Sequence, residues 1–367
     1  VIHYSAKSMH LWCILMRHIF NLHIIYTKYT ALRWCYGIYD RLLLELWNED
    51  HASFINFMRM APEMFDELLA RGGPRLTKQH TQVCYRAPIE PGLKLALTLR
   101  HLASGSRYAS MKFGWSVPHN TQSLIVREVF QAIINEYLEE VMSCPTTPGG
   151  WRTISEEFRT KWNFPHTLGA LDGKHIACRC PPNSGSMYYN YKGCYSIVLM
   201  ALVDADYKFN WANVGGMGSA SDVQIYNHCE LKEGDVPYYW IGDDAFALRH
   251  YMMKPYGQRC LTKEERIFNY KLSRARRVVE NTFGILSNRF QVLLSTMQHH
   301  PSTVKLIVTT CVILHNMMRM RHPRLQNQQL DHDLNTGPEA HSNLPNLGKC
   351  ALHLILPTGL ANCCCGT

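Results

Sequence analysis

Three acidic side chains, far apart along the sequence, have the types and surroundings that phosphoryl chemistry uses. Asp172 follows an apolar run in HTLGALDGKH (166–175), Asp243 follows the strand-like segment PYYWIG (237–242), and Glu280 lies in a long segment of helical periodicity. Carboxylate oxygens are the ligands that Mg²⁺ prefers. Acids on separate elements could therefore converge on a pair of such ions, which would promote attack on a phosphodiester and stabilise the leaving oxygen.

Each acid also has a simpler structural explanation. Asp172, in an Asp-Gly dipeptide between two apolar runs, has the sequence of a tight hairpin turn. Asp243 and Asp244 precede AFALRHYMM and would cap a helix there. Glu280 is spaced for an i,i+4 ion pair with Arg276, which would contribute only about a few tenths of a kcal/mol. Taken singly, the structural explanations are favoured; the combination of all three acids favours a metal site.

Hydrophobic periodicity indicates which elements position these acids. Residues 37–72 have the pattern of helices, with a stop at the Gly-Gly-Pro of 72–74. Residues 93–105, 107–115 and 120–141 are predicted to form three helices with tight joints, the last one capped by Asn120 or Thr121. This spacing suits a helix-turn-helix layout, although an ordinary helical bundle is the commoner outcome.

The pattern changes after CPTTPGGW (144–151), whose prolines and glycines indicate a long joint. The continuous apolar run at 195–203 is typical of a central strand, DADYK (204–208) turns the chain into FNWANV, and PYYWIG is a further strand. Helices are predicted over 263–290, opened by a capping box of Thr262 and Glu265, and over 302–320. The prediction is an α/β fold with a mixed sheet flanked by helices and preceded by a helical region.

The composition indicates a globular chain with a polyanionic partner. Of 367 residues, 46% are hydrophobic and 18% charged, which excludes an intrinsically disordered protein, and the formal net charge is +9. Segment 262–290 carries seven Lys and Arg residues against three Glu, a balance of 7 − 3 = +4. Residues 9–26 are apolar, but Arg17 and three histidines interrupt them, so no membrane span is predicted.

Six separated motifs occur in a characteristic order: LGALDGKH, YYNYKGCYSIVLMALVDADYKF, GSASD, IGDDAFALR, FNYKLSRARRVVENTFGILSNRF and LHNMM. In this order the chain resembles the DDE endonuclease domain of PIF/Harbinger-type transposases and their domesticated nuclease relatives. The resemblance covers about residues 40–320. It implies an RNase H-like core with three metal-binding acids, and it strengthens the helix-turn-helix interpretation of 90–141.

The resemblance implies site residues that can be named in this chain. The catalytic, metal-binding acids would be Asp172, Asp243 and Glu280, with Asp243 preferred to Asp244 because it directly follows the strand glycine. Asp222 in GSASD is a candidate accessory acid, and Asp244 is held in reserve as another. Candidate DNA-binding residues are Lys174, His175, Lys192, Lys271, Arg274, Arg276 and Arg277.

The resemblance also implies function and partners. The expected activity is a metal-dependent DNA endonuclease or transposase that hydrolyses, and in transposition transfers, phosphodiester bonds with Mg²⁺ or Mn²⁺. The alternative is a domesticated DNA-binding or adaptor protein that keeps the nuclease fold without catalysis; a small-molecule hydrolase is a weaker third hypothesis. A Myb-like DNA-binding partner and a nuclear location are expected, and homo-oligomer formation is left open.

The same reasoning divides the chain into four parts. Residues 1–36 are unassigned and are expected to be a fragment edge or an incorrectly predicted exon; 37–150 form the helical region; 151–322 form the nuclease domain; and 323–367 are a disordered or unrelated tail. Cys311 and His315 are four residues apart on one helix and could share a metal, but core packing is the favoured interpretation of that apolar segment.

Overall fold

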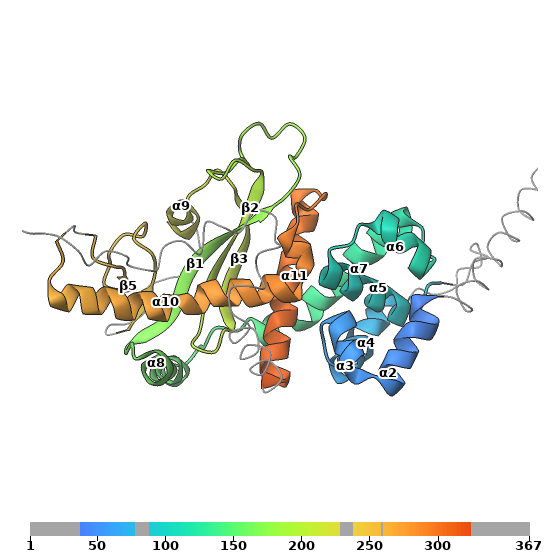
Figure 1. Cartoon of the computed structure of the whole chain (residues 1–367), viewed down its shortest axis with the longest axis horizontal. Coiled ribbons are helices and arrows are strands. Elements are labelled where there is room, and N and C mark those ends of the chain that lie inside the picture. Colours follow the sequence, from blue (N-terminus) through green and yellow to red (C-terminus); the bar gives the residue numbers. More distant parts are fainter. Residues whose placement is uncertain (1–36, 78–87, 228–237, 258–259, 324–367) are drawn as a thin grey trace, which may run out of the picture. The chain divides into compact units, whose positions relative to one another are not determined.

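The computed structural model describes residues 37–77, 88–227, 238–257 and 260–323 (Figure 1). The chain divides into two compact units, Val1–Arg319 and Met320–Thr367, and all of the site residues lie in the first. None of the helices in the described ranges combines the length and the apolar character that a bilayer span requires. The predictions for 1–36 and for all but the start of the tail lie outside the described residues, and the domain division at residue 150 stays a prediction.

Helices fill the first part of the described chain, as the periodicity predicts. They are η1 (Ile38–Leu43, a π-helical turn), α2 (Leu44–Glu49), α3 (His51–Met58), α4 (Pro62–Leu76), α5 (Pro91–Ser104), α6 (Tyr108–Trp115), α7 (His119–Val141) and α8 (Pro148–Trp162). The end predicted for α5 is confirmed, because Gly105 caps it with a positive φ of 64°. A side chain at this glycine would also meet the backbone of Gln291 and Val292 at 3.2 Å.

Two helix boundaries in this region were predicted wrongly. Helix α4 runs through the Gly-Gly-Pro segment to Leu76, because Leu68 and Leu76 are buried and α4 packs on both α5 and α7. Tertiary packing outweighs the low helix propensity of those residues. Helix α7 begins at His119 after Pro118, and neither Asn120 nor Thr121 caps it.

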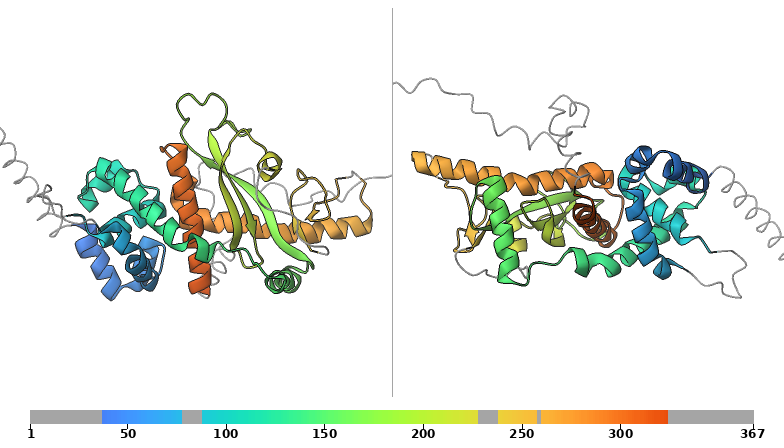
Figure 2. Two further views of the ribbon diagram at one scale, coloured as in Figure 1. Left: turned by 180° about the vertical axis from the view of Figure 1, so that it is seen from behind. Right: turned by 90° about the horizontal axis from the view of Figure 1, so that it is seen from below.

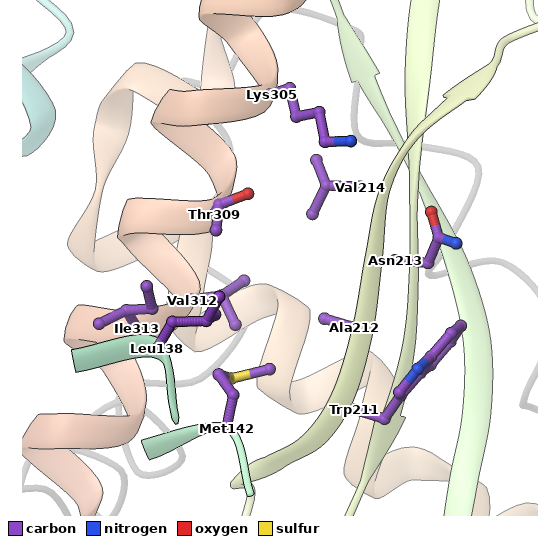
Figure 3. Close-up of a pocket in the computed structure, with 10 residues that line it drawn as sticks. All are labelled: Leu138, Met142, Trp211, Ala212, Asn213, Val214, Lys305, Thr309, Val312 and Ile313. Carbon is purple, nitrogen blue, oxygen red and sulfur yellow. The ribbon is translucent and has the colours of Figure 1, made fainter. Parts of the chain in front are cut away.

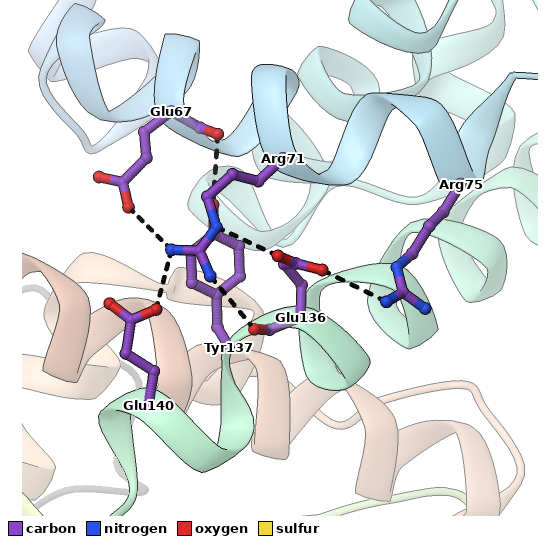
Figure 4. A network of polar contacts seen from close by, with 6 residues as sticks. All are labelled: Glu67, Arg71, Arg75, Glu136, Tyr137 and Glu140. Atoms are coloured by element: carbon purple, nitrogen blue, oxygen red, sulfur yellow. Dashed lines mark hydrogen bonds and ion pairs between the residues drawn. The ribbon is translucent and has the colours of Figure 1, made fainter.

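A polar network joins α4 to α7 (Figure 4). Arg71 of α4 donates to Glu136 at 3.2 Å and to Glu140 at 2.8 Å, and its guanidinium lies 4.3 Å from the ring centroid of Tyr137. The hydroxyl of Tyr137 donates to the carbonyl oxygen of Glu67 at 3.2 Å. One arginine therefore neutralises two glutamates of α7 and stacks on the aromatic ring between them, which fixes the two helices side by side.

The second part of the described chain contains a five-stranded mixed sheet. Its strands are β1 (Thr167–Ala177), β2 (Ser196–Val203), β3 (Phe209–Met217), β4 (Tyr239–Ile241) and β5 (Met252–Met253). They lie in the order β3-β2-β1-β4-β5; the pairs β1–β2 and β2–β3 are antiparallel, and β4 is parallel to both β1 and β5. The predicted fold class, an RNase H-like mixed sheet flanked by helices, is confirmed.

The predicted hairpin turn at Asp172 is wrong. Strand β1 continues through the Asp-Gly dipeptide, with Asp172 opposite Ala201 and Gly173 opposite Met200 of β2. Pairing along both halves of β1 stabilises the extended backbone more than the local turn preference disfavours it. Asp172 therefore lies in the middle of a central strand.

Helices cover both faces of this sheet. They are α9 (Asp222–Asn227), α10 (Lys263–Arg289) and α11 (Pro301–Arg321), with a short 3₁₀ turn η2 (Gln291–Leu294) after α10. Helix α10 crosses in front of the strands in Figure 1 and lies behind them in the left view of Figure 2, and it contacts β1 and β2. The predicted capping box at Thr262 and Glu265 is present. The apolar face of α10 is buried at Leu272, Ala275, Val279, Phe283 and Leu286, whereas Ile267 is 48% exposed.

Candidate active site

Asp172 faces the helix that carries Glu280. Successive side chains of a strand point to opposite faces, and Lys174, two residues on, has its ammonium nitrogen 5.8 Å from the ring centroid of Phe283 of α10. Asp172 shares that face, and its side chain is half-buried. One carboxylate oxygen accepts the backbone N–H of Gly173 at 2.9 Å. The strand thus directs the first acid toward α10, as the metal-site hypothesis requires.

The carboxyl of Asp172 is the most perturbed acid of this site. Desolvation raises its pKa to about 7, and repulsion from Asp222 and Asp243 acts in the same direction, while Arg276 and the N–H of Gly173 act against it. A desolvated carboxyl with acidic neighbours is the arrangement that functional sites use to shift a pKa. The three aspartates therefore lie within electrostatic reach of one another.

Asp243, rather than Asp244, is the acid next to Asp172. Asp243 follows β4, which pairs in parallel with β1, and it is half-buried, whereas Asp244 is exposed. Repulsion from Asp243 raises the pKa of both Asp172 and Asp222. The helix predicted after these acids does not form; the carboxylate of Asp243 instead accepts the N–H of Ala245 at 3.2 Å in a turn.

Asp222 reaches the site from the opposite face of β1. A Cβ placed on Gly173 would lie 2.2 Å from a carboxylate oxygen of Asp222, so this carboxylate packs directly on the glycine backbone. Burial raises the pKa of Asp222, repulsion from Asp243 adds to the effect, and Lys192 opposes it. The glycine of the Asp-Gly dipeptide is therefore explained by a close approach, because any side chain there would displace Asp222.

Glu280 lies on α10 but is oriented toward solvent. Its side chain is 55% exposed and forms an ion pair with Arg276, one helical turn earlier, at 3.4 Å. Arg276 is half-buried, its Nε has no hydrogen-bond partner among the described residues, and its charge lowers the pKa of Asp172. The predicted i,i+4 ion pair is confirmed. Arg276 thus interacts with both Asp172 and Glu280.

The candidate DNA-binding side chains fall into two groups. Lys174, His175 and Lys192 belong to β1 and to the β1–β2 connection; Lys192 is exposed, and the other two are half-buried. His175 lies on strand β1, and its Nδ1 is 2.9 Å from the hydroxyl oxygen of Ser196. The second group lies on α10, where Lys271, Arg274 and Arg277 are exposed and Arg276 is half-buried. Both groups lie on elements that also carry an acid of the site or adjoin it.

The carboxylate groups of the candidate site are ligands of the kind that bind a divalent cation. Asp172 and Asp243 offer oxygen ligands in a desolvated place where their negative charges repel, and a divalent cation would relieve that repulsion. Within the described residues, however, no three His, Cys, Asp or Glu side chains are grouped closely enough to hold a metal. Glu280 is instead in its ion pair with Arg276.

Two further features, a His-Cys pair and a pocket, lie apart from the acids. His315 and Cys311 are completely buried in α11, and Nε2 of His315 is 2.8 Å from the carbonyl oxygen of Tyr207, so the core-packing interpretation is confirmed. A pocket of about 410 Å³ lies between the end of α7, β3 and α11, where Trp211, Val214 and Lys305 line it (Figure 3). None of the acids of the candidate site lines this pocket.

Residues 171–316 match the family profile described as DDE superfamily endonuclease. Over this segment the chain is similar to the DDE superfamily endonucleases. The matched range begins one residue before Asp172, contains Asp243 and Glu280, and ends at Asn316 of the LHN motif. The resemblance predicted from the order of the sequence motifs is confirmed.

Curated relatives extend this similarity beyond the matched domain. "Putative nuclease HARBI1" of Xenopus laevis is 26% identical over 241 residues, which cover 62% of this chain and 68% of the relative. The human protein of the same name is 25% identical over 237 residues, covering 62% and 67%. "Protein ALP1-like" of Arabidopsis thaliana is 22% identical over 277 residues, covering 68% and 66%. No solved structure matches this chain.

Two residues beside the candidate Lys192, Asn190 and Tyr191, were not selected from the sequence. The connection between β1 and β2 holds a buried Asn190 and a highly exposed Tyr191 close to His175. The signal was available in YNYKG, because an asparagine three residues before a glycine is typical of a tight turn.

Proposed function

We propose that this chain is a metal-dependent DNA endonuclease of the Harbinger type. The observation that carries the proposal is the placement of Asp172 in the middle of β1, facing α10, with Asp243 close enough to raise the pKa of its carboxyl. The DDE endonuclease domain and the nuclease names of the relatives support the reaction class. DNA is the substrate that this reaction class and the net charge of +9 favour.

In this proposal Asp172 and Asp243 hold the cation or cations, Mg²⁺ or Mn²⁺, and Glu280 completes the ligand set. Divalent cations, when bound, supply Lewis-acid stabilisation of the charge that develops on phosphodiester oxygens. Glu280 would then contact the cation in addition to, or in place of, Arg276. Arg276 would be available to a phosphate group of the DNA, for which its planar guanidinium is well suited.

The exposed cations of α10 and of the β1–β2 connection would hold the DNA backbone. Lys271, Arg274 and Arg277 are exposed, as is Lys192, and each phosphate contact adds to the salt dependence of binding. Replacing Lys271 and Arg274 by glutamine should therefore weaken binding to all DNA sequences alike and reduce the slope of affinity against salt. A small-molecule hydrolase would show no such salt-dependent affinity for DNA.

A plasmid-nicking assay with Mg²⁺ or Mn²⁺ tests the proposal. Wild type should convert supercoiled plasmid to nicked or linear forms, whereas Asp172→Asn, Asp243→Asn and Glu280→Gln should each lose activity by about a hundred-fold or more. Glu264→Gln is the matched control, since it removes another exposed acid of α10, at the start of the helix. Asp244→Asn decides between the neighbouring acids. Cleavage that persists in Asp172→Asn would exclude the assignment.

A second candidate function is DNA binding or adaptor activity without catalysis. It is favoured by the outward orientation of Glu280 in its ion pair with Arg276, and by a relative, "Protein ALP1-like", whose name includes no nuclease activity. In that case wild type and Asp172→Asn would bind DNA equally and neither would cut under any metal or partner condition. The same nicking and binding assays distinguish the two candidates.

The proposal also includes a protein partner and a cellular location. We expect a Myb-like DNA-binding partner, because the transposases that the chain resembles depend on one for their target DNA. We also expect a nuclear location, since the substrate is there. Co-purification of the tagged full chain from nuclei, followed by nicking assays with and without the recovered partner, tests both expectations.

A further inference from the structure

A rigid turn lies between β1 and β2, over residues 190–194. Asn190 is only 3% exposed, and its side-chain oxygen accepts the N–H groups of Lys192 at 2.9 Å and Cys194 at 3.2 Å. Its side-chain nitrogen donates to the hydroxyl of Ser196 at 2.8 Å. Gly193 completes the turn with a positive φ of 77°. One buried side chain therefore fixes the backbone of the whole turn.

This turn presents an aromatic ring and a cation to solvent. Tyr191 is 82% exposed, and the ammonium nitrogen of Lys192 lies 5.4 Å from its ring centroid. A single exposed aromatic residue is not unusual in itself. Here, however, the backbone that carries it is held by hydrogen bonds from a buried asparagine, so the ring is displayed from a fixed support.

The turn adjoins the acids. The ring of Tyr191 makes an edge contact with His175, at 5.5 Å between centroids, and His175 contacts the same Ser196 hydroxyl that holds the turn. His175 is three residues from Asp172 along β1, about 10 Å at the rise of a strand, and its side chain is on the opposite face, the one that Gly173 shares and on which Asp222 lies. The positive charge of Lys192 also reaches Asp222, whose pKa it lowers against the effect of burial.

We propose that Tyr191 stacks on an unpaired base of the DNA strand next to the scissile phosphate, while Lys192 neutralises a neighbouring phosphate. This inference rests on the proposed nuclease function and specifies its substrate: DNA with an unstacked or single-stranded nucleotide at the cleavage site. A flat ring beside a cation is the combination by which proteins bind single-stranded nucleic acid. A purely apolar partner surface would have no use for the lysine.

Fluorescence of 2-aminopurine tests the stacking without requiring cleavage. The full chain carrying Asp172→Asn is titrated, in Ca²⁺, with a duplex that contains one unpaired 2-aminopurine and with the fully paired duplex. Tyr191→Ser should weaken binding of the unpaired probe by about ten-fold or more and abolish its fluorescence quenching. Tyr191→Phe should restore both effects, since it keeps the ring, and the paired duplex should bind all variants alike.

A second variant tests the support of the ring. Asn190→Ala keeps Tyr191 but removes the bonds that hold the turn, and should lose most of the preference for the unpaired probe. Urea unfolding of each variant checks that the fold is intact. Equal binding of the unpaired probe by Tyr191→Ser and the parent chain would overturn the inference, and so would an equal loss for the paired duplex.

The outcome for the stacking is separable from the outcome for the nuclease. If the plasmid assay shows no cleavage but the 2-aminopurine signature depends on Tyr191, the nuclease proposal fails and the stacking role stands. If the plasmid is cut and Tyr191→Ser leaves every DNA measurement unchanged, the stacking role fails and the nuclease stands. The latter result would assign the exposed ring to a protein contact instead.

Discussion

Replacing Asn316 should destabilise the fold strongly, because this buried side chain holds three backbone groups. It is fully buried in α11, and its side-chain nitrogen donates to the carbonyl oxygens of Phe209 at 2.8 Å and Val141 at 2.9 Å. Its side-chain oxygen accepts the N–H of Phe209 at 2.9 Å. One amide therefore pairs with the first residue of β3 and also satisfies a carbonyl at the end of α7.

The change Asn316→Ala should lower the free energy of unfolding by about 3–5 kcal/mol. Three buried backbone groups lose their partner, and each unsatisfied group costs about 1–3 kcal/mol; water that enters the vacated space would reduce the sum. A loss of this size is a large part of the roughly 5–15 kcal/mol that stabilises a typical domain. The expected result is a much lower urea midpoint with an unchanged slope.

Urea unfolding, followed by circular dichroism, gives this number, with Asn213→Ala as the matched control. Asn213 lies on β3, the strand that begins with Phe209, but is only half-buried, so its replacement should change stability by less than about 0.5 kcal/mol. The reasoning fails if Asn316→Ala costs less than about 1 kcal/mol, or if Asn213→Ala costs as much. Either result would mean that the LHN motif acts through something other than these hydrogen bonds.

Three further changes have definite expected outcomes. Burial lowers the pKa of His101 to about 4 and that of His315 to about 3. Between about pH 7 and pH 5 these two histidines therefore take up protons only in the unfolded chain. Each of them lowers the free energy of unfolding by about 2 kcal/mol over that range. Carboxyls with a raised pKa act in the opposite direction, so the readout is the loss of this slope in His101→Gln and His315→Gln relative to wild type. Gly173→Ala should lower the free energy of unfolding by about 1–3 kcal/mol, because the new Cβ meets the carboxylate of Asp222. A double-mutant cycle should show that much of this loss disappears when Asp222→Ala is also present. Arg71→Met should cost about 1 kcal/mol at low salt and less at about 1 M NaCl, because screening weakens the ion pairs, whereas a salt-independent loss would assign the effect to packing alone.

The parts of the fold with strong local signals could be predicted from the sequence. The capping box of Thr262 and Glu265 marks the start of α10, the apolar run at 195–203 marks β2, and the glycine at 105 ends α5. In each of these places the local preference agrees with the tertiary contacts. Such agreement is what allows a single sequence to indicate an element and its boundary.

The errors occurred where a local preference opposed packing. Asp172 has the neighbours of a turn residue, but its backbone pairs with β2 on one side while β1 pairs with β4 on the other. The residues around Asp172 do not indicate that β2 and β4 pair with this segment, because both strands lie tens of residues away in the sequence. The close packing of Asp222 on Gly173 was hidden for the same reason, although Asp222 had been selected as an accessory acid from its motif.

The Asp-Gly dipeptide is better understood as a pair of adjacent strand positions than as a turn. Because side chains alternate along β1, Asp172 points toward α10 and its cations, while the missing side chain of Gly173 leaves room for the carboxylate of Asp222 on the other face. Asp243, at the end of the neighbouring strand β4, raises the pKa of both aspartates and so lies within reach of both faces. A turn could not hold the two directions apart, whereas a strand that pairs with β2 through both residues fixes them. The mid-strand position thus accounts for both residues of the dipeptide: the acid faces the helix that bears Glu280, and the glycine admits the fourth carboxylate.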